Sequence, residues 1–192
     1  LTAYTMTKDD HYRTVAVECL EYALRELALP NGGFASSQDA DTDGIEGRHY
    51  CWSRAEAREV LGDEYEALLD TLEITESGTF EENGWSVLRL DPPLCERPED
   101  EQIQLKQALK LLKAARDQRT PPARDDKFIC SWNALMASAF AKAGRILNEP
   151  RYITIAAETL SHIDQQLFIS KTTRRRLLRR PYGDEEPILA FA

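Results

Sequence analysis

The chain has 192 residues, of which 42% are apolar and 30% are charged, and its formal net charge is −9 at pH 7. This composition is typical of a soluble globular protein that is long enough to bury a hydrophobic core. The negative charge argues against general nucleic-acid binding, because phosphate groups would be repelled, and no apolar run approaches the roughly 20 residues that span a membrane. We therefore expect neither nucleic acid nor a membrane as a partner.

In chain order, the first predicted element is an amphipathic helix over residues 11–27, where apolar side chains recur at helical spacing. Pro30 and the two glycines after it end that pattern. Two short strand-like runs, residues 33–37 and 48–52, then flank an acidic stretch. They predict a β-hairpin with a long loop.

Ser53 and Glu56 match a capping box, which predicts the start of a second helix. That helix is expected to break near Gly62, and a further helical piece follows to about Leu72. Residues 73–98 hold no helical period, and turn signals surround one predicted strand over 85–90.

A helix is next expected over residues 99–116. After a loop, Ser131 can cap a mostly apolar helix over residues 132–147. Pro150 suits the first turn of the last clear helix, which is expected to run to about Phe168. The fold class predicted by these elements is all-α with a small β-hairpin.

One internal similarity relates residues 1–27 to residues 141–167 at a constant offset of 140. Identical pairs are Ala3/Ala143, Tyr12/Tyr152, Thr14/Thr154, Ala16/Ala156, Glu18/Glu158, Leu20/Leu160 and Leu27/Leu167. Each segment has the pattern of a helix end, a polar turn and a long helix. A helix–turn–helix unit used twice is typical of helical arrays and toroids.

The acidic stretch Q-D-A-D-T-D-G-I-E-G, residues 38–47, resembles the opening of a calcium loop. An EF-hand that starts at Asp39 needs a bidentate glutamate at its twelfth position, and Tyr50 stands there instead. Two other interpretations stay open: an acidic turn at a hairpin tip, or a looser metal site with oxygen ligands from Asp39, Asp41, Asp43 and Glu46.

A second polar stretch, R-D-D-K-F-I-C-S-W-N, covers residues 124–133. Adjacent Asp125 and Asp126 at the start of a buried helix could raise the pKa of one carboxyl group and create a general acid. The alternative is that both carboxylates pair with Lys127 and with the helix dipole.

Other polar groups give weaker signals. The basic run over residues 173–180 adjoins acidic residues and is interpreted as a solvated terminal segment. The histidines are scattered, so no catalytic arrangement can be proposed for them. The four cysteines form no C-x-x-C pair, which predicts neither a zinc site nor a redox dithiol. Reduced thiols and the lack of a signal segment favour a cytoplasmic protein.

Several stretches occur together in a characteristic order: P-N-G-G-F-A-S-S-Q-D-A-D-T-D-G-I-E-G-R-H-Y-C-W-S, E-V-L-G, G-T-F-E-E-N-G-W-S-V-L, A-A-R-D-Q-R-T-P-P-A-R-D-D-K and S-W-N-A-L-M. In this order and spacing they resemble the YyaL-type, spermatogenesis-associated thioredoxin-domain family. The resemblance covers about residues 1–168. It implies a thioredoxin-like domain followed by an (α/α) toroid similar to those of N-acylglucosamine 2-epimerases and six-hairpin glycosidases.

The resemblance implies that residues 1–168 are part of an (α/α)6 toroid, and that residues 169–192 form a separate basic and then acidic tail. It also implies a cleft for a sugar-like ligand, with acid/base chemistry of an epimerase, isomerase or hydrolase type. The expected catalytic residues are Asp125 and Asp126. The expected substrate-binding residues are Gln38, Asp39, Asp41, Lys127, Trp132 and Asn133.

A different class of function stays open, namely a non-catalytic scaffold that binds partners for the attached thioredoxin-like domain. No cofactor is predicted, and a metal is the least favoured use of the acidic stretch. An incomplete toroid would leave apolar helix faces uncovered, so self-association of this piece is also expected.

Overall fold

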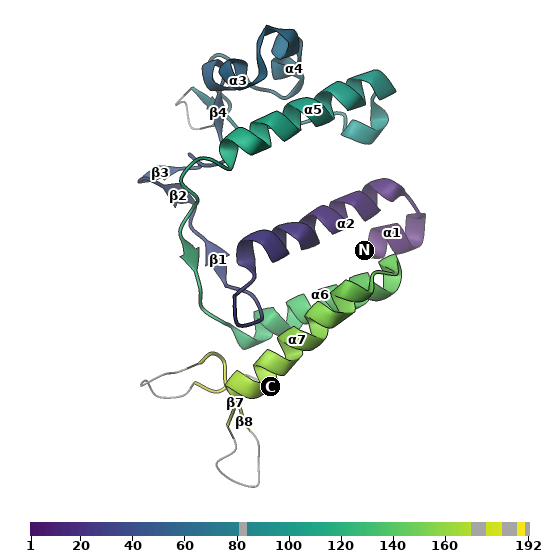
Figure 1. Cartoon of the computed structure of the whole chain (residues 1–192), viewed down its shortest axis with the longest axis vertical. Helices are drawn as coiled ribbons and strands as arrows, with labels where there is room; N and C mark the ends of the chain where they lie inside the picture. Colours follow the sequence, from purple (N-terminus) through teal and green to yellow (C-terminus); the bar gives the residue numbers. More distant parts are fainter. Residues whose placement is uncertain (81–83, 170–175, 182–187, 191–192) are drawn as a thin grey trace. The chain divides into compact units, whose positions relative to one another are not determined.

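The computed structural model describes residues 1–80, 84–169, 176–181 and 188–190 of the chain (Figure 1). The chain is mostly helical with small β-hairpins, as predicted. Within the described residues, no helix combines the length and apolar character that crossing a membrane would require. The chain forms two compact units, Leu1–Gln38 with Arg124–Ala192 and Asp39–Ala123 between them in sequence.

The first unit consists mainly of helices that share one apolar core. The helices are α1 (Thr2–Thr7), α2 (Asp10–Tyr22) with a π-helical turn η1 (Ala23–Leu27), α6 (Cys130–Leu147) and α7 (Pro150–Leu167). Figure 1 shows α6 and α7 side by side. The Phe140 ring centre lies 5.4 Å from that of Phe34 and 5.6 Å from that of Tyr152, so aromatic contacts join α6 to α7 and to the loop after η1.

The predicted repeat of a helix–turn–helix unit is confirmed within this unit. Lys8 ends α1 in the left-handed conformation with φ of 61°, and Asn148 ends α6 in the same conformation with φ of 56°. The following helices begin at Asp10 and Pro150, and they end at Leu27 and Leu167. The turn and both helix boundaries therefore recur at the offset of 140 residues.

Two pairs of short strands lie at one end of the first unit. At this end, which we call the loop end, η1 and α7 finish and α6 begins. Strand β1 (Ser37–Gln38) pairs antiparallel with β6 (Arg124–Asp125), and β7 (Phe168–Ile169) pairs with β8 (Arg176–Leu177). Leu178 is buried with Ile163 and Leu167. The interpretation of residues 173–180 as a solvated segment is therefore wrong at Leu178, because that side chain covers the end of α7; residues 173–175 lie outside the described part.

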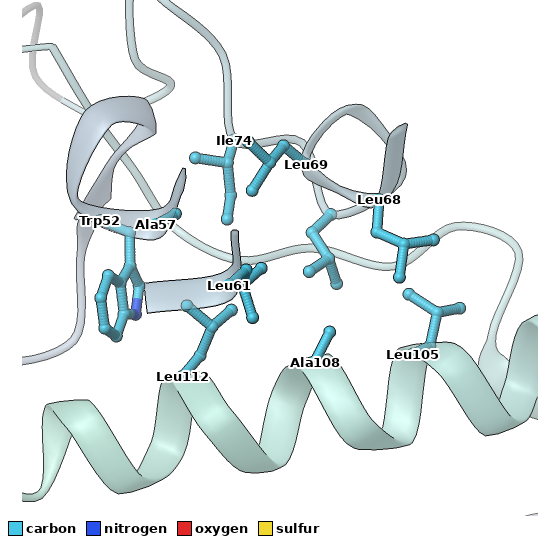
Figure 2. Close-up of a cluster of buried hydrophobic side chains, with 10 residues drawn as sticks. Trp52, Ala57, Leu61, Leu68, Leu69, Ile74, Leu105, Ala108 and Leu112 are labelled. Atoms are coloured by element: carbon cyan, nitrogen blue, oxygen red, sulfur yellow. The ribbon is translucent and has the colours of Figure 1, made fainter. Parts of the chain in front are cut away.

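The second unit packs three helices around its own core. They are α3 (Arg54–Leu61), α4 (Glu66–Thr71), joined by the 3₁₀ turn η2 (Asp63–Tyr65), and α5 (Glu99–Arg116), which follows the 3₁₀ turn η3 (Leu94–Glu96). Figure 2 shows Leu105, Ala108 and Leu112 of α5 facing the side chains of α3 and α4. The predicted helix boundaries and the break at Gly62 are confirmed.

Two of the strand predictions need correction. Residues 33–37 do not pair with 48–52; instead β2 (Asp41–Thr42) pairs with β3 (Ile45–Glu46), and β4 (Trp52–Ser53) pairs with β5 (Trp85–Ser86). The strand expected over residues 85–90 is thus only two residues long. Such short strands carry no detectable alternation, so their partners are decided by contacts between distant segments.

Local capping predictions had mixed outcomes. The capping box at Ser53 and Glu56 is confirmed, since each side chain bonds the other residue's backbone N–H. Ser131 does not cap α6, which begins one residue earlier, at Cys130. The Cys130 N–H donates to the carbonyl oxygen of Arg179 at 2.9 Å, so a distant backbone group satisfies one of the helix's free donors.

Candidate functional site

The loop end of the first unit is built on a backbone clamp around Phe34. The buried Asn133 side chain accepts from the Phe34 N–H at 2.7 Å and donates to the carbonyl oxygens of Phe34 at 3.0 Å and Ile129 at 3.1 Å. Both N–H groups of the amide are therefore used within the fold. Asn133 therefore holds the loop against α6, and its predicted role in binding a substrate stays a prediction.

Gly33 makes this clamp sterically feasible. Its φ is 76°, and a Cβ atom there would approach Phe128 Cε2 to 2.2 Å and Asn133 Oδ1 to 2.9 Å. Any side chain at this position would collide with the clamp and adopt an unfavourable backbone conformation. The loop of residues 28–36 is thus fixed closely against the start of α6.

Asp125 is fixed by its own neighbours. Its carboxylate accepts from the Lys127 N–H at 3.2 Å and from Lys127 Nζ at 2.8 Å, and its carbonyl oxygen accepts from Ser36 Oγ at 3.0 Å. The bond from the Lys127 ammonium group lowers the pKa of the Asp125 carboxyl group. A raised pKa, which a general acid would need, was expected for one of the two aspartates and does not occur at Asp125.

Asp126 has a different environment. Its Oδ1 accepts from Arg124 Nε at 2.5 Å, and Arg124 Nη1 also donates to the carbonyl oxygens of Glu26 and Ala28, each at 3.2 Å. Arg124 therefore links the Asp126 carboxylate to the end of η1. The arrangement orients this carboxylate as a hydrogen-bond acceptor.

Asp126 borders a polar groove on the first unit. The groove has a volume of about 460 Å³. Its lining comes from the loop after η1, from Asp126 and from the end of α7: Leu29, Pro30, Asn31, Gly32, Asp126, His162, Gln165 and Gln166. An adjoining hollow of about 360 Å³ shares this loop and α7, and it adds Glu158 and Ser161. A carboxylate, an imidazole and several amides thus face one space.

The other predicted residues of this unit lie outside the groove lining. The Gln38 side-chain oxygen accepts from the Tyr22 hydroxyl at 2.7 Å. Lys127 bonds Asp125, as described above, and Trp132 lies in the first turn of α6 with 53% of its surface exposed. An exposed indole ring is available for stacking, but the structure does not bring it to the described groove.

The remaining predicted residues, Asp39 and Asp41, belong to the second unit. Asp39 Oδ1 accepts from the Asp41 N–H at 3.2 Å, and Asp43 and Gly44, both with positive φ, form the two-residue turn between β2 and β3. Asp-Gly is a favoured sequence for such a turn. The acidic stretch is therefore an acidic hairpin, and among the described residues no three His, Cys, Asp or Glu side chains form a group that could hold a metal ion.

The Arg119 side chain bonds backbone groups within the second unit. Its Nη1 donates to the carbonyl oxygens of Arg48, His49 and Cys51, at 3.2, 3.2 and 2.7 Å. Its guanidinium carbon lies 3.9 Å from the centre of the Trp52 ring. Burial lowers its pKa, which fits a structural group rather than a free anion receptor.

The groove residues on α7 were missed by sequence reasoning. His162, Gln165 and Gln166 stand at positions i, i+3 and i+4 of one helix, so they share a face. That spacing was the available signal, but nothing local distinguishes a polar groove wall from a solvated helix face. The connection to Asp126 appears only when the loop folds against α7.

The fold and the groove define a mostly helical protein with repeated helix–turn–helix units and a polar small-molecule-sized groove. No family model matches the chain. Human spermatogenesis-associated protein 20 is 27% identical over 94% of the chain, and the rat protein of the same name is 26% identical over 86% of it. These similarities support the family on which the sequence resemblance rests.

The chain spans about a quarter of the length of these curated relatives, 27% of the human protein and 25% of the rat protein. The similarity therefore concerns one part of a longer protein in those relatives. The thioredoxin-like domain, the toroid and the location in the cell stay predictions.

Proposed function

We propose that the chain is part of an (α/α) toroid of the carbohydrate-processing type, and that the loop end of its first unit binds a sugar-like ligand. The repeated helix–turn–helix units support the toroid part of this proposal. The single observation that carries the ligand part is the polar groove bordered by Asp126. Carboxylate and amide groups can bond the hydroxyl groups of a sugar without needing a charge on the ligand.

The two aspartates take different roles in this proposal. Asp126 borders the groove, and one of its oxygens is oriented by Arg124, so it is the candidate for accepting a hydroxyl hydrogen or a proton from the ring. Asp125 is held by Lys127 and anchors the loop. The reaction class that fits is acid/base chemistry at a sugar ring, of an epimerase, isomerase or hydrolase type.

Ligand-observed NMR with glucose, mannose and N-acetylglucosamine tests the proposal. At least one of these sugars should bind the chain, and Asp126→Asn should weaken that binding about tenfold, the loss expected for one hydrogen bond to a charged group. Asp125→Asn is the matched comparison, because it removes the same charge one residue away and should have a much smaller effect. Absence of binding by all three sugars, or equal binding by Asp126→Asn, would contradict the proposal.

A partner-binding scaffold is the second candidate, and one observation favours it. On α6, Trp132 and Leu135 lie one helical turn apart, with 53% and 70% of their surfaces exposed. Exposed apolar side chains on one helix face are typical of protein contacts. A thioredoxin-like domain of the related family should then co-elute with the chain in size-exclusion chromatography, and Leu135→Ser should abolish this, whereas separate elution of the two native proteins would exclude it.

A further inference from the structure

The Asp126 groove is lined by polar groups that make few hydrogen bonds with other described residues. Neither ring nitrogen of His162 bonds another described residue, and the same holds for the side-chain amides of Gln166 and Asn31. The Gln165 amide nitrogen donates to Ser161 Oγ at 3.1 Å, which leaves the amide oxygen as an acceptor. Polar groups that share one space and bond no other described residue are suited to contact a polar ligand.

The His162 ring is also held in place by its neighbours. The centre of its ring lies 4.8 Å from that of Phe128 in an edge-to-face arrangement. The imidazole also lies beside Gly32, since a Cβ atom added to Gly32 would be 3.6 Å from His162 Nδ1. Phe128 is buried in the core below, so the imidazole rests on a rigid support. A ring that is held in one orientation is preorganised for hydrogen bonding.

The helical spacing lets three side chains of this wall act on one ligand. Side chains three and four residues apart on a helix have Cβ atoms about 5–6 Å apart. His162, Gln165 and Gln166 can therefore reach neighbouring groups of a single small molecule. The imidazole can donate from one nitrogen and accept with the other, while each amide offers donors and acceptors. This combination matches the hydroxyl groups of a polyhydroxylated ring, each of which both donates and accepts.

We propose that His162, Gln165 and Gln166 form a ligand-binding wall for an uncharged polyhydroxylated ring, with His162 bonded directly to a ring hydroxyl. This inference rests on the proposed function and adds residues, on a helix far from Asp126 in sequence, that define how the ligand is recognised. The ring then lies between the Asp126 loop and α7.

Histidine NMR tests the assignment on the native chain. The probes are glucose, mannose and N-acetylglucosamine, each titrated while the imidazole signals of His11, His49 and His162 are followed. A sugar that binds should shift the His162 signal saturably and leave the signals of His11 and His49 in place. His162→Gln should weaken binding about tenfold, as for a lost hydrogen bond in a ligand site.

The control is His11→Gln, at the start of α2 and away from the groove lining, which should bind the sugar as the native chain does. Circular dichroism and the unfolding midpoint of each variant establish that the fold is kept. Sugar binding with an unmoved His162 signal, or with full affinity in a folded His162→Gln variant, would overturn the α7 wall and leave the proposed function standing. Absence of binding by every probe would overturn both.

Discussion

The first compact unit contains two helix–turn–helix repeats. They have identical residues at several matching positions, but these residues are buried to different extents. Tyr152 is 1% exposed, whereas Tyr12, at the matching position, is 41% exposed. Leu20 is 6% exposed, whereas its counterpart Leu160 is 53% exposed. The buried face of α2 is thus rotated relative to that of α7, although both helices have the same boundaries within the repeat.

The contacts that each helix makes with α6 account for the difference. Before α7, the 18-residue α6 runs alongside and packs against the face that carries Tyr152, Ala156 and Thr159. On α2, by contrast, Leu20 lies in the core cluster with Phe140 and Leu147 of α6. The comparison teaches that the repeated sequence sets where helices start and stop, while the neighbouring helix decides which side chains become core.

Substitution of the two matched tyrosines should give the largest contrast. Tyr152→Ala removes a buried ring that contacts Phe140, so it should lower the free energy of unfolding by about 3–4 kcal/mol. Tyr12→Ala removes a ring from the surface and should cost less than about 0.5 kcal/mol. Urea unfolding of both variants measures the difference, and similar losses for the two would refute the contrast in burial.

The matched leucines should give the opposite order. Leu20→Ala opens a cavity in the core shared by α2 and α6 and should cost about 2–3 kcal/mol. Leu160→Ala changes an exposed side chain and should stay within about 0.5 kcal/mol of the native chain. If Leu160→Ala proves the more damaging variant in the same urea assay, then α2 and α7 bury the same face after all.

Helix boundaries were predictable because their signals are local. The capping box of Ser53 and Glu56, Pro150 in a first turn and the apolar spacing of residues 99–116 all act within a few residues of one another. Strand pairing was not predictable, since β1 finds its partner β6 on the far side of the second unit in sequence. A two-residue strand has no period from which a partner could be inferred.

The candidate site was predictable only in part, for a similar reason. A charged loop before an apolar helix pointed to Asp126, and the structure sets that residue beside a polar groove. The same argument did not predict that Asn133 bonds the backbone of Phe34, because a sequence does not show which groups a side-chain amide faces. His162 was missed, since it reaches the groove through the packing of α7 and not through a local motif.

The starts of α2 and α7 provide a third contrast between the two repeats. The Asp9 side chain accepts from the His11 N–H at 2.8 Å and caps α2, whereas Glu149, at the matching position, makes no side-chain cap for α7. Asp9→Ala should therefore cost about 1 kcal/mol. Glu149→Ala should change stability by no more than a few tenths of a kcal/mol, and equal losses in thermal unfolding would contradict the assignment of the cap.

The smallest expected effect concerns Glu21, a residue of the first repeat that contacts the second repeat. Its carboxylate accepts from the Tyr152 hydroxyl at 2.7 Å and pairs with Arg151, and the Tyr152 bond followed by Arg151 lowers its pKa. A lowered pKa in the folded state stabilises the protein above the ordinary glutamate pKa, and this contribution is lost as the pH falls through the lowered value. Because the side chain is 38% exposed, solvent screening limits the effect to a few tenths of a kcal/mol.

Glu21→Gln should accordingly be less stable than the native chain at neutral pH, and the difference should vanish in acid below the usual range of glutamate. Glu18→Gln, an exposed change on the same helix, is the control and should show no such pH-dependent difference. Urea midpoints measured from neutral to acidic pH would reveal it. If the difference in stability stays constant across that range, the charge of Glu21 does not stabilise its contact with Tyr152 and Arg151.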